Sequence, residues 1–549
     1  MLSLPGQNNS KQPMPTSKQW NCLIAAWLII AVGLAVRLAL APHFLLVPDE
    51  ANYWQWSRHL ALGYHDHPPM IAWTIWLAGR VFGQSEFAVR LPTILGLTLA
   101  SVYLFLLAGR WFSCRCGFHA MLLMQGVLLF NGAALIATPD GLLLPCWAAA
   151  TYHAAVAWEN RGTTRLHWLA CGLWFGIGLL SKYTMLLFLP SLLLFLLSNP
   201  QGRRALATPW PWFGLLAGFA CFTPVILWNA DNGWATFRHV LYQGGLENKS
   251  FFTLRFIGDF LGGQALLLSP LAFVMILLAW LGFGKSSLRT SPDASFLRTL
   301  FATTFVVFLL LSLHVRIYGN WPAPAYLTAI ILVAALYSPA RNNGTSRPAR
   351  FWKVSVTLAY LITLPLLVHL VYPILPLPPR LDRIAKETAG WDQLGTRIRQ
   401  EVAAMTRPKQ TFIFGLRYQY ASELAFYTPG RPETVSINRW ARPNVYDYWT
   451  DEHDLIGKDG IGVYEWKGMA ERIGRLFERI DPPEAVTLYR DSPWFGRQAV
   501  QTLYIIRGYG FKGGLHWQPR DRSDIRATRQ VTDSRKENQE TLRTRKTTP

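Results

Sequence analysis

Residues 21–50, NCLIAAWLIIAVGLAVRLALAPHFLLVPDE, join an apolar run to the acidic pair Asp49-Glu50. A bilayer core about 30 Å thick requires roughly 20 apolar residues in a helix, so we expect the run to be a retained membrane-spanning helix rather than a cleaved signal peptide. Carboxylates placed at a membrane surface directly after such a helix are costly and usually mark chemistry. Acidic residues also favour the start of a helix, so a structural role for the pair remains an alternative.

The composition separates a membrane region from a soluble region. Of the 549 residues, 51% are hydrophobic and 15% are charged, whereas soluble domains have about 25% charged residues. Long apolar runs recur up to residue 373, and the composition is ordinary after that point. We therefore predict a polytopic α-helical membrane protein with about eleven transmembrane helices, followed by an external α/β or α+β domain. The predicted divisions are a cytoplasmic tail (1–19), a transmembrane domain (20–375) with an external loop (42–87), an external domain (376–516) and a disordered basic tail (517–549).

The orientation follows from the loops between the candidate spans. These spans are residues 20–41, 88–109, 117–137, 141–158, 167–181, 183–198, 210–229, 263–284, 297–315, 321–338 and 352–373. Alternate loops carry most of the arginines and lysines, and the positive-inside rule assigns basic loops to the cytoplasm. The amino terminus is then cytoplasmic, and the odd number of spans places the C-terminal domain outside the inner (plasma) membrane. The polar groups outside the basic loops share that external face; they are Asp49, Glu50, Asp66, His67, Asp140, Lys182 and Asn320.

Charge and cysteine usage disfavour several classes of function. The net charge of +21 comes from basic residues scattered over loops and a polar tail, which is typical of membrane proteins and does not indicate nucleic-acid binding. None of the six cysteines lies in the C-terminal region, which excludes a disulfide framework there. His65, Asp66 and His67 are crowded in sequence, yet no HxxxH or CxxC pattern offers a closed site. We expect no metal or other cofactor, with a divalent metal as the open alternative.

The first external loop, residues 42–87, has the pattern of two short helices lying along the membrane interface. Apolar residues recur at helical spacing in ANYWQWSRHLALG, Pro68-Pro69 breaks the chain, and MIAWTIWLAGRVFG is again amphipathic. The tryptophans in both stretches are typical of an interfacial belt, and some could stack on a sugar. Because the external face has neither ATP nor nucleotide sugars, a reaction there needs an activated substrate delivered through the membrane, and a lipid-phosphate carrier is the natural candidate.

Five blocks of sequence, in chain order, resemble one family of enzymes. They are VPDEANYWQWSRHLALGYHDHPPMIAW, FGQSEFAVRLP, ATPDGLLLPCWA, LLSKYTMLLFLP and NWPAPAY. They are similar to the bacterial glycosyltransferase family 39/83, which includes protein O-mannosyltransferases and lipid A aminoarabinose transferases. Further on, FGLRYQYASELAFYTPGRPETVSIN and NVYDYW resemble a subgroup of family 39. Each block alone is weak, whereas the ordered set, which covers nearly all of residues 20–450, is strong. The resemblance implies a C-type glycosyltransferase fold and transfer of a sugar from a polyprenyl phosphate to an acceptor on the external face.

The resemblance also assigns roles to individual residues. By position, Asp49 is the catalytic carboxylate, Glu50 completes the motif and Asp140 matches the second acidic position. His67 lies in the HPP element, where relatives place a basic or polar group toward the donor phosphate. Glycosyl transfer needs a general base, and we assign this role to Asp49, assisted by Glu50 or Asp140. A single displacement without a nucleophilic residue predicts inversion of the anomeric configuration.

The departing phosphate has to be neutralised, and three further cations are candidates: Arg58, Arg90 and Lys182. Arginine can bind phosphate with two parallel hydrogen bonds, and a lysine flanked by lipid-facing segments is more often functional than accidental. Asp66 and Asn320 are additional candidates for substrate binding. Structural alternatives exist, since Arg90 could snorkel to the interface and Arg58 could cover a helix face.

The rest of the chain carries weaker signals. Residues 230–262 have the pattern of a mobile loop that could order over substrate, with Arg238 and His239 as weaker phosphate candidates. A role in the folded core is the favoured interpretation for Arg417, Tyr418, Glu423 and Tyr427. The acceptor stays open between a lipid, a glycan and a protein. The competing functions are a transporter or flippase of a lipid-linked saccharide, which the scarcity of charges within the spans disfavours, and a noncatalytic scaffold.

Overall fold

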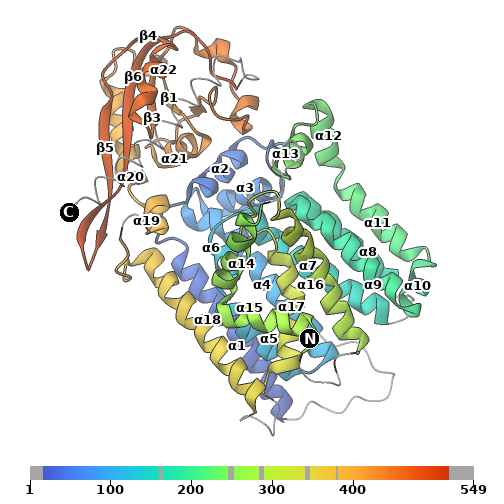
Figure 1. Ribbon diagram of the computed structural model, residues 1–549. Coiled ribbons are helices and arrows are strands. Elements are labelled where there is room, and N and C mark those ends of the chain that lie inside the picture. Colours follow the sequence, from blue (N-terminus) through green and yellow to red (C-terminus); the bar gives the residue numbers. More distant parts are fainter. Residues whose placement is uncertain are drawn as a thin grey trace. The chain divides into compact units, whose positions relative to one another are not determined.

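The computed structural model describes residues 17–159, 165–244, 253–283, 288, 290–339, 346–378 and 381–517 (Figure 1). The two predicted tails lie almost wholly outside these residues. The chain forms two compact units. The helical unit comprises Met1–Arg399, Ser422–Arg431 and Thr487–Thr502, and the sheet unit comprises Gln400–Ala421, Pro432–Val486 and Leu503–Pro549.

Each candidate span lies on one helix or on two consecutive helices. The single helices are α1 (Ser17–Leu40), α4 (Glu86–Trp111), α7 (Pro139–Glu159), α8 (Arg165–Ser181), α16 (Pro292–Leu311), α17 (Ala323–Tyr337) and α18 (Arg347–Val371). The divided spans are α5 (Cys114–Gly126) with α6 (Leu128–Leu135), η1 (Tyr183–Leu187) with α9 (Phe188–Ser198), α11 (Trp210–Cys221) with α12 (Thr223–Asp231), and α14 (Arg255–Leu268) with α15 (Pro270–Trp280). Short helices α10 (Pro200–Leu206), α13 (Ala235–Gln243) and α19 (Arg383–Thr388) lie between or after them.

Fewer helices pass a strict test for a membrane crossing. Among the described residues, α1, α4, α16 and α18 are long and apolar enough to span a bilayer. The number rises to 7 if each bent pair is one span, with bends of 67° between α5 and α6, 43° between α11 and α12, and 108° between α14 and α15. The predicted count of about eleven spans is therefore not confirmed, because several helices, such as the 15-residue α17, are shorter than the roughly 20 residues that a full crossing needs.

Helices α8 and α11 lie side by side, and glycines allow their close approach (Figure 1). A Cβ atom at Gly172 would lie 1.8 Å from the backbone oxygen of Gly214, so no side chain fits between the two backbones. Gly176 and Gly218 repeat this contact one turn further along, which is the small-residue spacing typical of helix pairs in membranes. The contact holds α8, whose last residue leads directly into Lys182.

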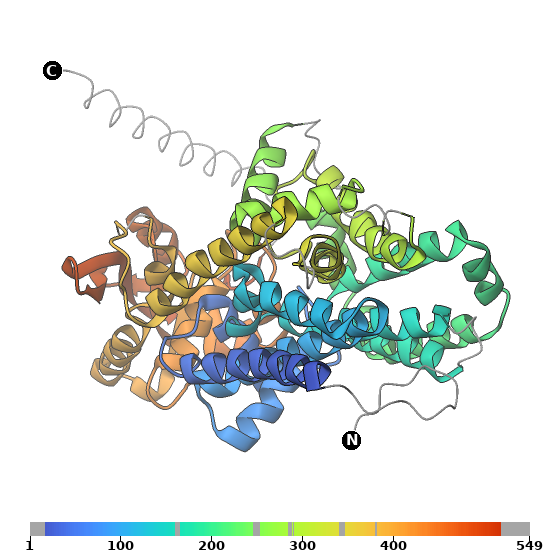
Figure 2. The same ribbon diagram turned by 90° about the horizontal axis from the view of Figure 1, so that it is seen from below.

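A buried polar cluster stabilises the bend between α5 and α6. Arg37 of α1, a helix that runs alongside α5 in both views, donates to Asn131 Oδ1 from Nε (3.2 Å) and Nη2 (2.9 Å) and to Gln125 Oε1 from Nη2 (2.5 Å) (Figures 1 and 2). Asn131 in turn donates from Nδ2 to the backbone oxygens of Gln125 (2.8 Å) and Val127 (2.9 Å). A bend in an apolar region requires such replacement bonds for the backbone, because no water is present to supply them.

Residues 42–87 form the two predicted helices, α2 (Pro48–Arg58) and α3 (Met70–Phe82). Pro48 begins α2, where its fixed φ suits the first turn. All residues of α2 from Glu50 to Ser57 are buried, so protein encloses this helix more completely than we expect for a helix lying on a bilayer. By contrast, α3 exposes Leu77, Val81 and Phe82, an apolar face suited to the membrane surface.

The sheet unit contains a mixed sheet with the strand order β2-β1-β3-β6-β4, and β5 pairs with β6. The strands are β1 (Thr411–Gly415), β2 (Thr434–Ser436), β3 (Asp459–Tyr464), β4 (Phe477–Ile480), β5 (Glu484–Ser492) and β6 (Gly496–Phe511). β1 is parallel to β2 and β3, whereas β6 is antiparallel to β3 and β4. The helices beside these strands in the chain are α20 (Trp391–Ala404), α21 (Tyr418–Tyr427) and α22 (Ala470–Gly474).

Candidate active site

Glu50 and Arg90 form a fully buried clamp at the start of α2. Arg90 of α4 donates from Nε to Glu50 Oε1 (2.9 Å) and from Nη2 to Glu50 Oε2 (2.7 Å), and neither side chain is exposed. Glu50 also accepts the backbone N–H groups of Val47 (3.0 Å) and Ala137 (2.8 Å). A carboxylate has about four acceptor positions, so Glu50 has none left for a substrate proton. Its predicted assisting role in catalysis is corrected to that of a positioning residue that joins α2, α4 and the start of α7.

Arg90 is also committed to the protein. Its Nη1 donates to the backbone oxygens of Ala41 (2.7 Å) and Phe44 (2.8 Å), and its Nη2 donates to that of Leu45 (2.9 Å). Together with the two bonds to Glu50, these contacts use all five donors of the guanidinium. The prediction that Arg90 binds the donor phosphate is therefore wrong for this arrangement, and so is the snorkelling alternative, because the side chain is directed inward.

Asp49 is the exposed member of the acidic pair. It lies in the first turn of α2 beside the clamped Glu50, and successive helical residues point about 100° apart. The clamp therefore fixes the helix turn that presents the Asp49 carboxylate. Arg383 of α19 is one of its charged neighbours: a bond to Glu387 (2.6 Å) and, to a smaller extent, the charge of Asp49 raise the pKa of Arg383.

A second cluster brings together three residues that the sequence motifs had singled out. Lys182 Nζ, between α8 and η1, lies 2.7 Å from both carboxylate oxygens of Asp140 at the start of α7. Asn320 Nδ2, just before α17, donates to Asp140 Oδ2 (2.7 Å). Asp140 and Lys182 are 2% and 7% exposed, so this ion pair is shielded from solvent. Ala137, whose N–H group is bonded to Glu50, lies three residues before Asp140 in the chain, so this short segment connects the clamp to the cluster.

His67 is electrically neutral near this cluster. Burial and the nearby ammonium group of Lys182 lower the pKa of His67 to about 4, against smaller opposing effects of Asp66 and Asp140. A neutral imidazole can donate one hydrogen bond to a phosphate, but it does not neutralise the phosphate charge. The predicted contact between His67 and the donor phosphate therefore remains a prediction, limited to a neutral hydrogen bond.

The lowered pKa of His67 predicts acid sensitivity. The unfolded chain takes up a proton near pH 6.5, whereas the folded chain does so only near pH 4, so stability falls by up to about 1.4 kcal/mol per unit as the pH decreases between these values. We expect His67→Gln to remove this part of the decline. Thermal unfolding midpoints of both proteins from pH 7.5 to 4.5 measure it, and parallel pH profiles would contradict it.

Arg58 lies far from Asp49 on the same helix. It ends α2, about 13 Å along the axis at 1.5 Å per residue, and it donates to Gln55 Oε1 (3.0 Å). Its guanidinium lies over the ring of Trp54, 5.0 Å from the centroid. The structure thus favours the alternative in which Arg58 covers a helix face.

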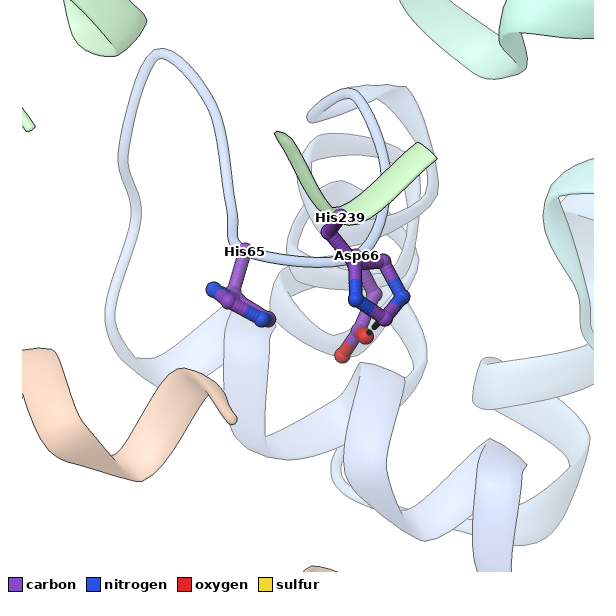
Figure 3. Close-up of side chains that lie close together, drawn as sticks. All are labelled: His65, Asp66 and His239. Carbon is purple, nitrogen blue, oxygen red and sulfur yellow. Dashed lines mark ion pairs between the residues drawn. The ribbon is translucent and has the colours of Figure 1, made fainter. Parts of the chain in front are cut away.

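Asp66, His65 and His239 form a group that could hold a metal ion (Figure 3). Their nearest ligand atoms all lie within 4.8 Å of one another, and His239 Nε2 lies 3.0 Å from Asp66 Oδ1. Two imidazoles and one carboxylate are a donor set that suits Zn²⁺. A metal would have to replace the existing bond between His239 and Asp66 and the contact between His239 Nε2 and Gln243 Nε2 (2.8 Å). Sequence spacing could not reveal this group, because α13 supplies His239.

Measurement of bound metal shows whether His65, Asp66 and His239 bind a metal ion or whether His239 and Asp66 form only an ion pair. If the group binds zinc, the wild type retains about one equivalent after chelation and dialysis against Zn²⁺, and His239→Ala loses it, whereas the exposed His43→Ala behaves as the wild type. Elemental analysis of the purified proteins provides the measurement. Equal zinc content in the wild type and His239→Ala would show that the group does not bind zinc and that His239 and Asp66 form only an ion pair.

Comparison with known proteins agrees with the motifs. Residues 66–228 match the family described as dolichyl-phosphate-mannose-protein mannosyltransferase. The chain is similar to the undecaprenyl phosphate-alpha-4-amino-4-deoxy-L-arabinose arabinosyl transferase of Pseudomonas aeruginosa, with 29% identity over 56% of this chain and 58% of that protein. It is also similar to the lipid A galacturonosyltransferase RgtD of Rhizobium johnstonii, with 25% identity over 62% of this chain and 70% of that protein. The match spans only 58% of the length of the first of these relatives.

The fold has a solved counterpart. The crystal structure of ArnT from Cupriavidus metallidurans bound to undecaprenyl phosphate matches with a TM-score of 0.63 and 15% identity, over 89% of this chain and 98% of that chain. The apo structure of the same protein matches with a TM-score of 0.59 and 14% identity, over 87% and 97% of the two chains. The predicted resemblance is thereby confirmed: the chain has the fold of ArnT and is similar to an undecaprenyl phosphate aminoarabinose arabinosyl transferase and to a lipid A galacturonosyltransferase.

Proposed function

We propose that the protein is an integral-membrane glycosyltransferase that moves a sugar from a polyprenyl phosphate to an acceptor on the external face of the inner membrane. The observation that carries the proposal is the buried clamp of Glu50 and Arg90, which presents Asp49 alone of the acidic pair to solvent. Two independent supports are the fold shared with ArnT and the similarity to two enzymes whose names describe sugar transfer.

Asp49 acts as the general base in this proposal. It accepts the proton of the acceptor hydroxyl while that oxygen attacks the anomeric carbon and the bond to the phosphate breaks. The lipid phosphate leaves with the electron pair of that bond, and the sugar configuration inverts. Lys182 Nζ has three N–H donors and gives two to Asp140, so the third is available for a phosphate oxygen, with His67 as a neutral donor beside it.

Orientation and acceptor are part of the proposal. The alternation of basic loops supports a cytoplasmic amino terminus, about eleven crossings that include short and bent helices, and an external C-terminal domain. Since one relative is named for lipid A, lipid A is the first acceptor to test, before a glycan or a protein.

A transfer assay in detergent tests the function against the transporter alternative. Micelles have no two sides, so a transporter yields no product in them. We expect purified protein, labelled polyprenyl-phosphate sugar and lipid A to give labelled lipid A. Absence of labelled product with lipid, glycan and protein acceptors alike would reject the transferase.

A further inference from the structure

Glu423 carries a carboxyl group that is buried in the helical unit. Its side chain is 0% exposed, and neither oxygen has a hydrogen-bond partner among the described residues. The residue belongs to the second half of α21, within the segment Ser422–Arg431 that forms part of the helical unit. A buried carboxylate without a partner is so costly that such groups normally keep their proton instead.

The charges around Glu423 favour the protonated form. Burial and then the negative charge of Glu50 raise the pKa of Glu423 well above its usual value, and Glu86 and Asp49 act in the same direction. Arg90 opposes them, but its five donors are used by Glu50 and by backbone oxygens. A charged Glu423 would thus join three other carboxylates with no donor of Arg90 left for it.

The segment that carries Glu423 contacts the helix that carries Asp49. The Tyr427 hydroxyl accepts the N–H of Leu46 (2.6 Å), just before α2, and donates to Glu86 Oε1 (3.1 Å) at the start of α4. The ring of Phe426 lies edge-on to that of Trp54 on α2, with centroids 4.9 Å apart. Such contacts fix the entry of α2 only while the segment remains in place.

We propose that Glu423 is a positioning residue that works in its uncharged form: its neutral carboxyl group lets Ser422–Arg431 pack against α2, and this packing holds the Asp49-Glu50 turn. Loss of its proton adds a negative charge beside Asp49, Glu50 and Glu86 and releases the segment. The segment also carries Tyr427, which remains protonated because burial raises its pKa, and Arg431, whose Nη2 donates to the backbone oxygen of Gln84 (2.7 Å). We call the packing of Ser422–Arg431 against α2 the docking of this segment. Its dependence on the proton of Glu423 does not rest on the proposed transferase activity.

The direction of the pH dependence follows from proton uptake. In the docked segment, the carboxyl group of Glu423 keeps its proton. In the released segment, its pKa is that of an ordinary glutamate, near 4.3, so the proton is lost at neutral pH. Docking therefore becomes up to tenfold less favourable for each unit of rising pH, between about 4.3 and the raised value in the folded protein. Below about 4.3 both states are protonated, and docking is independent of pH.

Hydrogen exchange of the full-length protein in detergent tests this. After correction for intrinsic exchange rates, amide protection of residues 424–431 in the wild type should fall by up to about 100-fold from pH 6 to pH 8. In Glu423→Gln, which keeps the shape and cannot ionise, protection should stay constant and exceed that of the wild type at pH 8. The same pH profile in both proteins would overturn the proposal.

Two further variants complete the design. Glu423→Met is apolar and of similar length, so it should also give a flat profile, which keeps the test valid if the amide of Gln disturbs folding. Glu471→Gln changes a side chain that is 82% exposed and should retain the pH dependence of the wild type. Pronounced pH dependence in Glu423→Met would count against the carboxyl group. Because exchange is measured without substrate, failure here is distinct from failure of the transferase assay.

Discussion

Replacement of Asp49 by asparagine is expected to lower the rate of sugar transfer by about 10²–10⁴-fold, the range that general acid–base catalysis contributes. An amide has a similar shape but does not accept the proton of the acceptor hydroxyl. Because Asp49 is exposed and the clamp belongs to Glu50 and Arg90, the fold should remain intact. The measurement is the initial rate of labelled acceptor formation at saturating donor, together with the thermal unfolding midpoint.

The control for this variant is Asp231→Asn, which removes another exposed carboxylate of the helical unit at the end of α12. It should transfer sugar at the wild-type rate. Undiminished transfer by Asp49→Asn would sink the role of Asp49 as base. A lost rate accompanied by a large drop in unfolding midpoint would instead make Asp49 a structural residue.

The largest effect on stability is expected for Glu50→Ala, at about 3–5 kcal/mol. The substitution leaves the Arg90 guanidinium buried without its counter-charge and removes the acceptor of the Val47 and Ala137 N–H groups. The unfolding midpoint and the yield of monodisperse protein in detergent measure the loss. Glu471→Ala, at an exposed site, should change stability by less than about 0.5 kcal/mol.

A double variant separates the ion pair from other losses. Because both partners of the clamp are buried, Glu50→Ala combined with Arg90→Leu should destabilise less than the sum of the two single changes, with a coupling of about 0.5–3 kcal/mol. Additive effects would show that the two side chains act independently and would contradict the clamp.

Apolar periodicity located the helices, and the motifs located one cluster of the site. Asp140, Lys182 and Asn320, up to 180 residues apart in the chain, do converge. Periodicity reports which residues avoid water, so it finds helices well, but it does not show where two helices meet at an angle. The break between α5 and α6 depends on the side chains of Asn131 and Gln125, which read as ordinary polar residues in an apolar run.

The roles of Arg90 and Glu423 could not be predicted either, because they depend on contacts that no sequence pattern records. Three bonding partners of Arg90 are backbone oxygens, which every residue possesses and no motif records. Glu423 is unusual because its carboxyl oxygens have no hydrogen-bond partner within the described part of the chain, which is a property of its three-dimensional surroundings alone. In the same way, Asp66 was a candidate from its motif, whereas its neighbour His239 comes from α13, much later in the chain.

Arg37 has a consequence for the order of assembly in the membrane. Its partners, Gln125 and Asn131, are 88 and 94 residues further along the chain, so α1 is synthesised before the two side chains that bind Arg37 in the folded protein. Until then the guanidinium has to reach the interface, which its place one turn before the end of α1 allows. We expect the inward swing of Arg37 to accompany the arrival of α5 and α6. Premature packing of α1 is thereby discouraged, and the first helix of the chain is among the last to reach its final contacts.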